Sequence, residues 1–331
     1  MTTYIVRRLL WLIPVIFFVS LITFTLMHAT PGGPWDRDPS ARQVDARTQE
    51  LLNSRFGLDK PWFINISGGN PLDSQFLNYL WGLVHLDLGP SYRQRGLDVQ
   101  AILFQPSEGK PFFDSKFGYS ARLGLLALGL AVVFGIPFGI IAALNRNTIV
   151  DYITLFLSTI GISVPNFVLG ILLIIVFAGQ LKIIKIVQAN WSAPGAWFIP
   201  AIILGFNTFA YITRLTRSTM LEVMQQDYIR TARAKGLANR VVVIRHMLRN
   251  ALIPVVTIMG PALAGLVTGS FIIESMFAFP GMGRQYVMSI QNRDYSMIMG
   301  TTLIFALLIA VANLTVDVIY GFLDPRIKVG D

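Results

Sequence analysis

The chain has 331 residues, of which 53% are hydrophobic and only 14% are charged. A soluble domain carries roughly 25% charged residues, so this composition excludes a soluble protein and indicates a polytopic membrane protein. The absence of cysteine excludes disulfides and thiolate metal sites. The formal charge of +9 is concentrated beside apolar segments, which favours anionic lipid headgroups over nucleic acid as the partner of the basic residues.

A membrane-spanning helix needs about 20 apolar residues, and six segments of the chain qualify. In chain order they cover residues 9–29, 123–144, 152–181, 197–213, 250–273 and 295–316. The fourth is short, and we expect it to continue into the amphipathic stretch that follows. The first is preceded by Arg7 and Arg8, as in a signal peptide, but its apolar stretch is too long and Met27-His28-Ala29-Thr30 is a poor cleavage site. We therefore predict that it is retained as a helix.

The predicted spans define an all-α chain with four parts. These are an N-terminal helix at 1–29, a polar segment at 30–120, a membrane core at 121–323 and a tail at 324–331. The polar segment is dense in turn signals such as Pro31-Gly32-Gly33-Pro34. Between these signals we expect short helices at about 41–56 and 74–85.

The basic residues predict how the spans are oriented. Arg7 and Arg8 precede the first span, eight basic residues lie between the fourth and fifth spans at 214–249, and Arg326 and Lys328 follow the sixth. Because the number of spans is even, all three regions and both termini lie on the same side of the membrane. Their basic residues identify that side as the cytoplasm. The segment 30–120 then lies outside, where its basic residues are matched by acids and where long translocated segments are largely exempt from the rule.

The stretch 227–237, between the fourth and fifth spans, is basic and rich in small residues. A helix here would place four residues on one face, where small side chains allow another protein to approach closely: Tyr228, Thr231, Ala232 and Lys235. Lys235 suits the negative end of the helix dipole, Gly236 suits a C′ stop, and Asn239 is a candidate cap for a following helix. An ordinary positive-inside loop would explain the charges but not the small residues.

With the run 245–254 after it, this stretch closely resembles the cytoplasmic coupling loop of bacterial ABC-importer permeases. The general family motif begins Glu-Ala-Ala, whereas Arg230-Thr231-Ala232 stand here, with a long interval from Gly236 to Pro254. Both departures are habitual in the dipeptide/oligopeptide/nickel branch. The longer-looped permease subunit of that branch is also matched at 4–10, 30–34, 56–61, 86–89, 279–284, 292–295 and 323–327. The stretch 104–119 departs from the family and looks inserted.

The resemblance implies a type I ABC-importer permease fold with six transmembrane helices and a large external segment after the first. It implies a location in the inner membrane of a bacterial or archaeal cell. Its expected partners are a second, homologous permease, two ATPase subunits and an external substrate-binding protein, with ATP and magnesium bound by the ATPases and no cofactor bound by this chain. Contact with an ATPase is then expected from Asp227, Tyr228, Arg230, Thr231, Ala232, Ala234, Lys235, Gly236 and Leu237.

Two further regions are candidates for a gate or a pathway wall. The loop from Glu274 through Phe279, Pro280 and Gly281 to Gly283 makes a sharp turn with aromatic neighbours, and is either a plug beneath a docked receptor or an interfacial aromatic anchor. The run 260–270 is dominated by small residues, which permit close helix packing or line a pathway. The family resemblance favours the pathway, with Ala264 and Thr268 on one face.

Polar residues also occur within or near the predicted spans: Asn166, Asn207, Glu274, Asn313 and Asp317. Polar groups inside a membrane usually face a cavity or a partner. Because Glu274 and Asp317 lie near span ends, we interpret them as structural.

Other functional classes fit the sequence less well. The chain has no phosphate-binding loop, and His28, His85 and His246 lie on different segments, so neither ATP hydrolysis by this chain nor a metal or acid–base centre is predicted. A secondary transporter would need mid-membrane coupling charges and often an inverted repeat, and neither is evident. Peptides are the expected cargo, with nickel complexes or another small solute as the alternative within the same branch.

Overall fold

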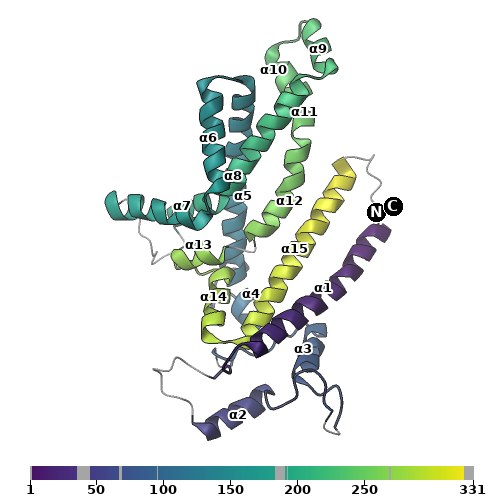
Figure 1. The fold of residues 1–331 in the computed structure, drawn as a ribbon, viewed down its shortest axis with the longest axis vertical. Helices are drawn as coiled ribbons and strands as arrows, with labels where there is room; N and C mark the ends of the chain where they lie inside the picture. Colours follow the sequence, from purple (N-terminus) through teal and green to yellow (C-terminus); the bar gives the residue numbers. More distant parts are fainter. Residues whose placement is uncertain are drawn as a thin grey trace. The chain divides into compact units, whose positions relative to one another are not determined.

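The computed structural model describes residues 2–35, 45–66, 69–94, 96–182, 191, 193–267 and 270–323 (Figure 1). The predicted tail at 324–331 lies outside these ranges. Within them the chain is helical, and the only β pairing is an isolated bridge between Pro90 and Asp98. The all-α class predicted from the apolar spans is confirmed. The chain forms two compact units, and each is described by itself.

The first unit contains the described residues up to Tyr119 together with Pro280–Ala310. Its elements are α1 (Thr2–Ala29), α2 (Ala46–Phe56), α3 (Gln75–Val84), α4 (Val99–Phe104), the short 3-10 helix η1 (Phe112–Asp114), α14 (Met282–Asn292) and the first part of α15 (Tyr295–Leu323). Both α1 and α15 are long and apolar enough to cross a membrane. The predicted first and sixth spans therefore exist as single helices.

Local capping explains the two short helices predicted in the polar segment. The Ser74 side chain accepts a hydrogen bond from the backbone of Leu77, which starts α3 one residue after the predicted boundary. Asp45 caps α2 in the same way, and Gly57 ends it in the left-handed conformation with φ of 67°. Both helices are confirmed where the structure describes them.

Two apolar clusters form the core of the first unit. In one, Phe24 and Met27 from α1 pack with Phe76 of α3 against Tyr295 and Met299 of α15. The other joins α4 to α14 and α15, and its buried members are Val99, Ile102, Leu103, Met282, Met297, Ile304 and Phe305. Phe104 and Phe117, at the edges of the inserted stretch, pack against this second cluster with ring centroids 5.3 Å apart. The insertion is thus anchored to the unit's core at both ends.

A buried aspartate fastens the external loops to the start of α15. Asp294 is only 3% exposed and accepts hydrogen bonds from Ser91 Oγ at 2.5 Å, Tyr92 N at 3.1 Å and Met297 N at 3.3 Å. It therefore caps α15 and holds the loop around residue 91 at the same time. Arg93 adds bonds to the carbonyls of residues 292 and 34. These contacts give the sequence Asn-Arg-Asp-Tyr at 292–295 a structural role.

The second unit consists mainly of Ser120–Phe279. Its elements are α5 (Lys116–Leu144), α6 (Ile149–Ser163), α7 (Asn166–Leu173), the π-helical η2 (Ile174–Gln180), α8 (Pro194–Met224), α9 (Asp227–Ala234), α10 (Asn239–Val241), the π-helical η3 (Val242–Met247), α11 (Leu248–Ala251), α12 (Ile253–Val267) and α13 (Phe271–Met276). The predicted continuation of the fourth span is confirmed, because α8 is one helix of 31 residues.

The third predicted span differs from the expectation of one helix. It is broken at Val164–Pro165, where α6 and the segment 166–180 meet at 107° (Figure 1). Proline has no N–H and disfavours helical backbone in the residue before it, so the helix ends there. Five helices in the described part of the chain are long and apolar enough to span a membrane, and six spans result if the bent pair counts as one.

Close helix packing in the second unit depends on glycines. A Cβ on Gly205 of α8 would lie 2.5 Å from the Ala127 carbonyl oxygen of α5, and one on Gly161 of α6 would lie 2.5 Å from Ala210 Cβ. Gly124 of α5 approaches the backbone of Leu266 on α12 equally closely. Without a Cβ these backbones can approach each other, as is common between membrane helices.

A buried ion pair also joins α6 to α8. Arg217 donates to Asp151 from Nε at 2.5 Å and from a terminal guanidinium nitrogen at 2.8 Å, in the two-pronged geometry that suits a carboxylate. The Asp151 side chain is 1% exposed and that of Arg217 is 18% exposed. The pair therefore lies largely away from solvent.

Candidate coupling site

The predicted coupling segment forms α9, a short helix with a well-defined end. Gly236 adopts φ of +72°, its N–H donates to the Arg233 carbonyl at 2.9 Å, and the Leu237 N–H donates to the Ala232 carbonyl at 3.4 Å. These two bonds form a Schellman motif, in which glycine takes the left-handed C′ position. The predicted helix stop at Gly236 is confirmed.

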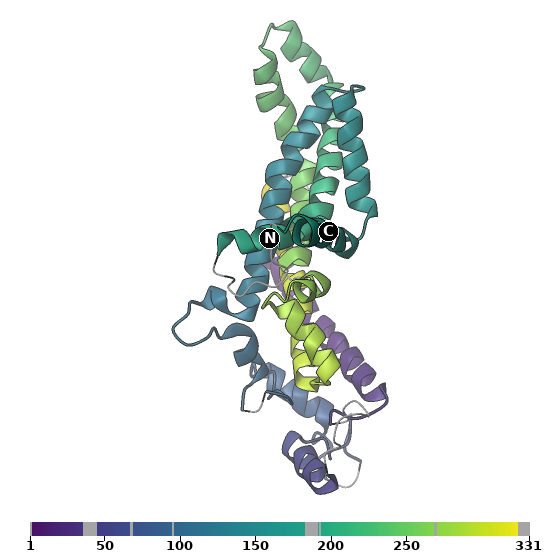
Figure 2. The ribbon, with the colours of Figure 1, turned by 90° about the vertical axis from the view of Figure 1, so that its left-hand side faces the viewer.

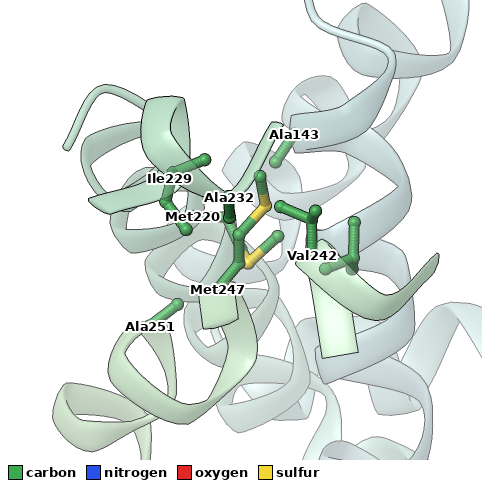
Figure 3. Close-up of a cluster of buried hydrophobic side chains, with 8 residues drawn as sticks. Ala143, Met220, Ile229, Ala232, Val242, Met247 and Ala251 are labelled. Carbon is green, nitrogen blue, oxygen red and sulfur yellow. The ribbon is translucent and has the colours of Figure 1, made fainter. Parts of the chain in front are cut away.

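One face of α9 packs against the rest of the second unit (Figure 3). Ile229 is completely buried and Ala232 is 6% exposed. They join a cluster whose other buried members are Ala143, Met220, Val242, Val243, Met247 and Ala251, from α5, α8, η3 and α11. Burying an isoleucine side chain stabilises a fold by about 1.5–3 kcal/mol, so α9 is fixed to its base and not suspended from a flexible loop.

This packing changes the interpretation of two predicted residues. Ala232 was expected on the face open to a partner, but it is covered by the chain's own cluster. Its small side chain allows α9 to lie close to η3 and the end of α8. Asn239 does not cap the next helix, because α10 begins at Asn239 itself and the cap position belongs to Ala238.

The remaining predicted contact residues form the exposed surface of this segment. They are Asp227, Tyr228, Arg230, Thr231, Ala234, Lys235, Gly236 and Leu237. The Asn250 side-chain amide donates to Tyr228 Oη at 2.8 Å, which fixes the ring beside α11. Arg230 and Asp227 form an exposed pair at 3.5 Å, and such pairs contribute little to stability. A polar, partly basic surface with small side chains thus lies on a rigid support.

The base of α9 connects directly to two long helices. Met220 lies near the end of α8, three residues after the ion-paired Arg217, and Met247 and Ala251 lead into α12. In both views α9 and α10 project beyond the ends of α5 and α6 (Figures 1 and 2). A displacement of α9 would therefore carry the ends of α8 and α11 with it, because close-packed side chains transmit strain.

A second group of predicted residues lies elsewhere in the same unit. Glu274 is completely buried in α13 and accepts a hydrogen bond from Ser120 Oγ at 2.8 Å. Phe279 is also completely buried, between the rings of Trp191 and Trp197 at centroid distances of 4.6 and 5.0 Å. The edge-to-face geometry stabilises such aromatic clusters. These contacts give Glu274 and Phe279 structural roles in the state described.

The other predicted gate and pathway residues are distributed over both units or lie outside the described residues. Ala264 is buried in α12 at 4% exposure, and Thr268 lies outside the described residues. Pro280, Gly281 and Gly283 belong to the first unit, where Gly281 precedes α14 at its N-cap position. The pathway role of these residues stays a prediction. In the part of the chain that the structure describes, no group of three potential metal ligands occurs.

Three structural residues were missed by the sequence analysis. The ion pair between Asp151 and Arg217 was not predicted. The available signal was an acid, Asp151, at the start of one apolar segment and a base, Arg217, at the end of another. Ile229 was not among the predicted coupling residues and was not recognised as their anchor. An isolated apolar residue in a basic segment is a signal that one face of the helix is buried.

Comparisons with known proteins identify the family of the chain. Residues 135–329 match the family of binding-protein-dependent transport system inner membrane components. The dipeptide transport system permease protein DppB of Bacillus subtilis is 39% identical over 328 residues, covering 99% of this chain and 98% of the relative. The oligopeptide transport system permease protein OppB of Escherichia coli K12 is 34% identical over 336 residues, covering 99% and 100%. A chain of the MetNI methionine ABC transporter has the same fold over 63% of this chain and 94% of its own, with a TM-score of 0.52 at 18% identity.

The chain therefore belongs to the family of inner-membrane permease components of binding-protein-dependent ABC importers. It is a non-catalytic membrane subunit of an ATP-driven importer, and it spans the membrane several times. The secondary-transporter alternative is thereby excluded.

Proposed function

We propose that this chain forms one half of the translocation pathway of a peptide importer and is driven through α9. The choice of cargo is supported by the relatives named above, a dipeptide and an oligopeptide permease that match the chain over nearly its whole length. The observation that carries the mechanism is the arrangement of α9, which has one face locked into the apolar cluster and the other face exposed.

In this proposal the partners are a second permease, two ATPase subunits and an external binding protein. The exposed face of α9 contacts an ATPase in the cytoplasm, where the basic loop and both termini lie, while the segment 30–120 faces outward. ATP-driven closure of the ATPases displaces α9. The closely packed cluster passes that displacement to α8 and α12, and the pathway changes from inward-open to outward-open.

The test changes the exposed face of α9 in the reconstituted complex. Ala234 is exposed, so Ala234→Arg should leave the permease folded and assembled but remove receptor-stimulated ATP hydrolysis and peptide uptake. Ile149→Arg introduces the same side chain at a 70% exposed position at the start of α6 and serves as the matched control. Normal stimulation in Ala234→Arg would refute the assignment of the docking face.

Nickel complexes or another small solute form the alternative cargo. Uptake into proteoliposomes with the cognate binding protein distinguishes the candidates, because competition among dipeptides, longer peptides and nickel complexes is measured on one preparation. Uptake of a nickel complex with no peptide uptake would refute the peptide assignment but leave the α9 mechanism intact.

A further inference from the structure

The break in the third span opens into a polar recess. The recess has a volume of about 330 Å³ and is lined by residues of the α6–α7 junction, α8 and α13: Ile162, Ser163, Val164, Pro165, Asn166, Phe167, Asn207, Ser270 and Ile272. All of these residues belong to the second unit. Its polar side chains are hydroxyls and amides, and none of the described residues that line it is charged.

The recess is deep along the helices that form it. Asn207 and Arg217 are ten residues apart on α8 (217 minus 207), which corresponds to about 15 Å of helix. α6 has 15 residues, so its broken end lies about 22 Å from its start. The hydrocarbon core of a bilayer is about 30 Å thick. In the proposed orientation, with the ion-paired Arg217 towards the cytoplasmic membrane surface, Asn207 would lie close to the centre of the bilayer.

The hydrogen bonds at the break use only some of the donor and acceptor atoms of the polar side chains there. Asn207 Nδ2 donates to the carbonyls of Gly161 at 3.1 Å and Ile162 at 3.5 Å, which the end of α6 leaves open. Asn166 Nδ2 donates to the Leu204 carbonyl at 3.4 Å. Among the described residues, no partner is found for the Oδ1 atoms of the two asparagines or for Ser163 Oγ.

Non-helical backbone at membrane depth is tolerated only where protein covers it or water reaches it. Broken helices with polar residues near the bilayer midplane form substrate sites in other transporters. We infer that this recess is a contact site for the peptide main chain on the translocation pathway, an inference that rests on the proposed function. Its uncharged donors and acceptors match the amide groups of any peptide and discriminate little among side-chain charges.

The experiment exploits the absence of cysteine from the chain. Ser163→Cys is nearly isosteric at an exposed position of the recess. Val133→Cys, at a 64% exposed position of the apolar helix α5, is the control. A charged methanethiosulfonate reagent needs water and a thiolate. In the assembled complex in proteoliposomes it should label Ser163→Cys at least about tenfold faster than Val133→Cys. Equally slow labelling of both would overturn the inference.

Protection by cargo tests main-chain recognition. Peptides that differ in side-chain charge should all slow labelling of Ser163→Cys during turnover, by about threefold or more when the site is largely occupied. An N-methylated peptide, supplied at a concentration that stimulates ATP hydrolysis equally, should protect much less. Equal protection by the N-methylated peptide would refute main-chain recognition. A complex that imports no peptide would instead refute the proposed cargo, and this is measured separately as uptake.

Discussion

The ion pair between Asp151 and Arg217 provides a quantitative test of how α6 is held to α8. Asp151→Leu removes the acceptor of both guanidinium bonds and leaves the Arg217 charge beside an apolar side chain. Breaking a buried pair by removing one partner costs about 3–5 kcal/mol. Because Arg217 is 18% exposed, water partly solvates the remaining charge, and we expect the lower end, about 3 kcal/mol.

This cost is measurable as a change in the melting temperature of the purified protein. For a unit of 150–250 residues each kcal/mol lowers Tm by about 2–4 °C, so Asp151→Leu should lower Tm by about 6–12 °C. The double variant Asp151→Leu/Arg217→Met replaces both charges with apolar groups of similar volume and should recover most of the loss. A double variant as unstable as Asp151→Leu would show that packing around Asp151, and not the unpaired charge, determines the effect.

Two further predictions concern the orientation and the external loops. In intact cells an impermeant thiol reagent should label Leu86→Cys, at a position 85% exposed in the polar segment, but not Asn239→Cys; the opposite pattern would reverse the proposed orientation. Asp294→Ala leaves three donors without their acceptor and should raise hydrogen exchange around Ser91 by about tenfold or more, whereas Asp73→Ala, at a partly exposed acid of the same unit, should not. Unchanged exchange in Asp294→Ala would show that other contacts hold the loop.

The sequence predicts the helices well wherever a local physical rule determines them. Uninterrupted apolar runs predict α1, α5 and α15, turn signals in the polar segment predict α2 and α3, and the glycine at Gly236 predicts the end of α9. The break at Val164–Pro165 was missed because hydropathy is insensitive to backbone geometry: the residues on both sides are apolar, and a proline within an apolar run is common in membrane helices. Only the tertiary bonds from Asn207 distinguish this break from a tolerated kink.

The candidate site was predictable in position but not in orientation. Charge, small residues and the terminal glycine identify α9, yet the helical period alone does not determine which face meets the protein's own core. Ile229 provides that information, since an isoleucine three residues before Ala232 places both on one face. The contacts of Glu274 and Phe279 depend on residues far away in the sequence, such as Ser120 and Trp191, and no local pattern contains them.

The proposed coupling surface and the proposed peptide contact share one element, α8. Along this single helix Asn207 lines the recess, Arg217 binds α6 and Met220 enters the cluster beneath α9. A helix is stiff along its axis, so motion imposed at Met220 reaches Asn207 unless packing absorbs it. The ion pair between Asp151 and Arg217 makes α6 move with α8. The carbonyls that accept hydrogen bonds from Asn207 lie at the other end of α6. Displacement of α9 would therefore move the recess as a whole. The recess would keep its shape while the membrane surface from which it is accessible changes.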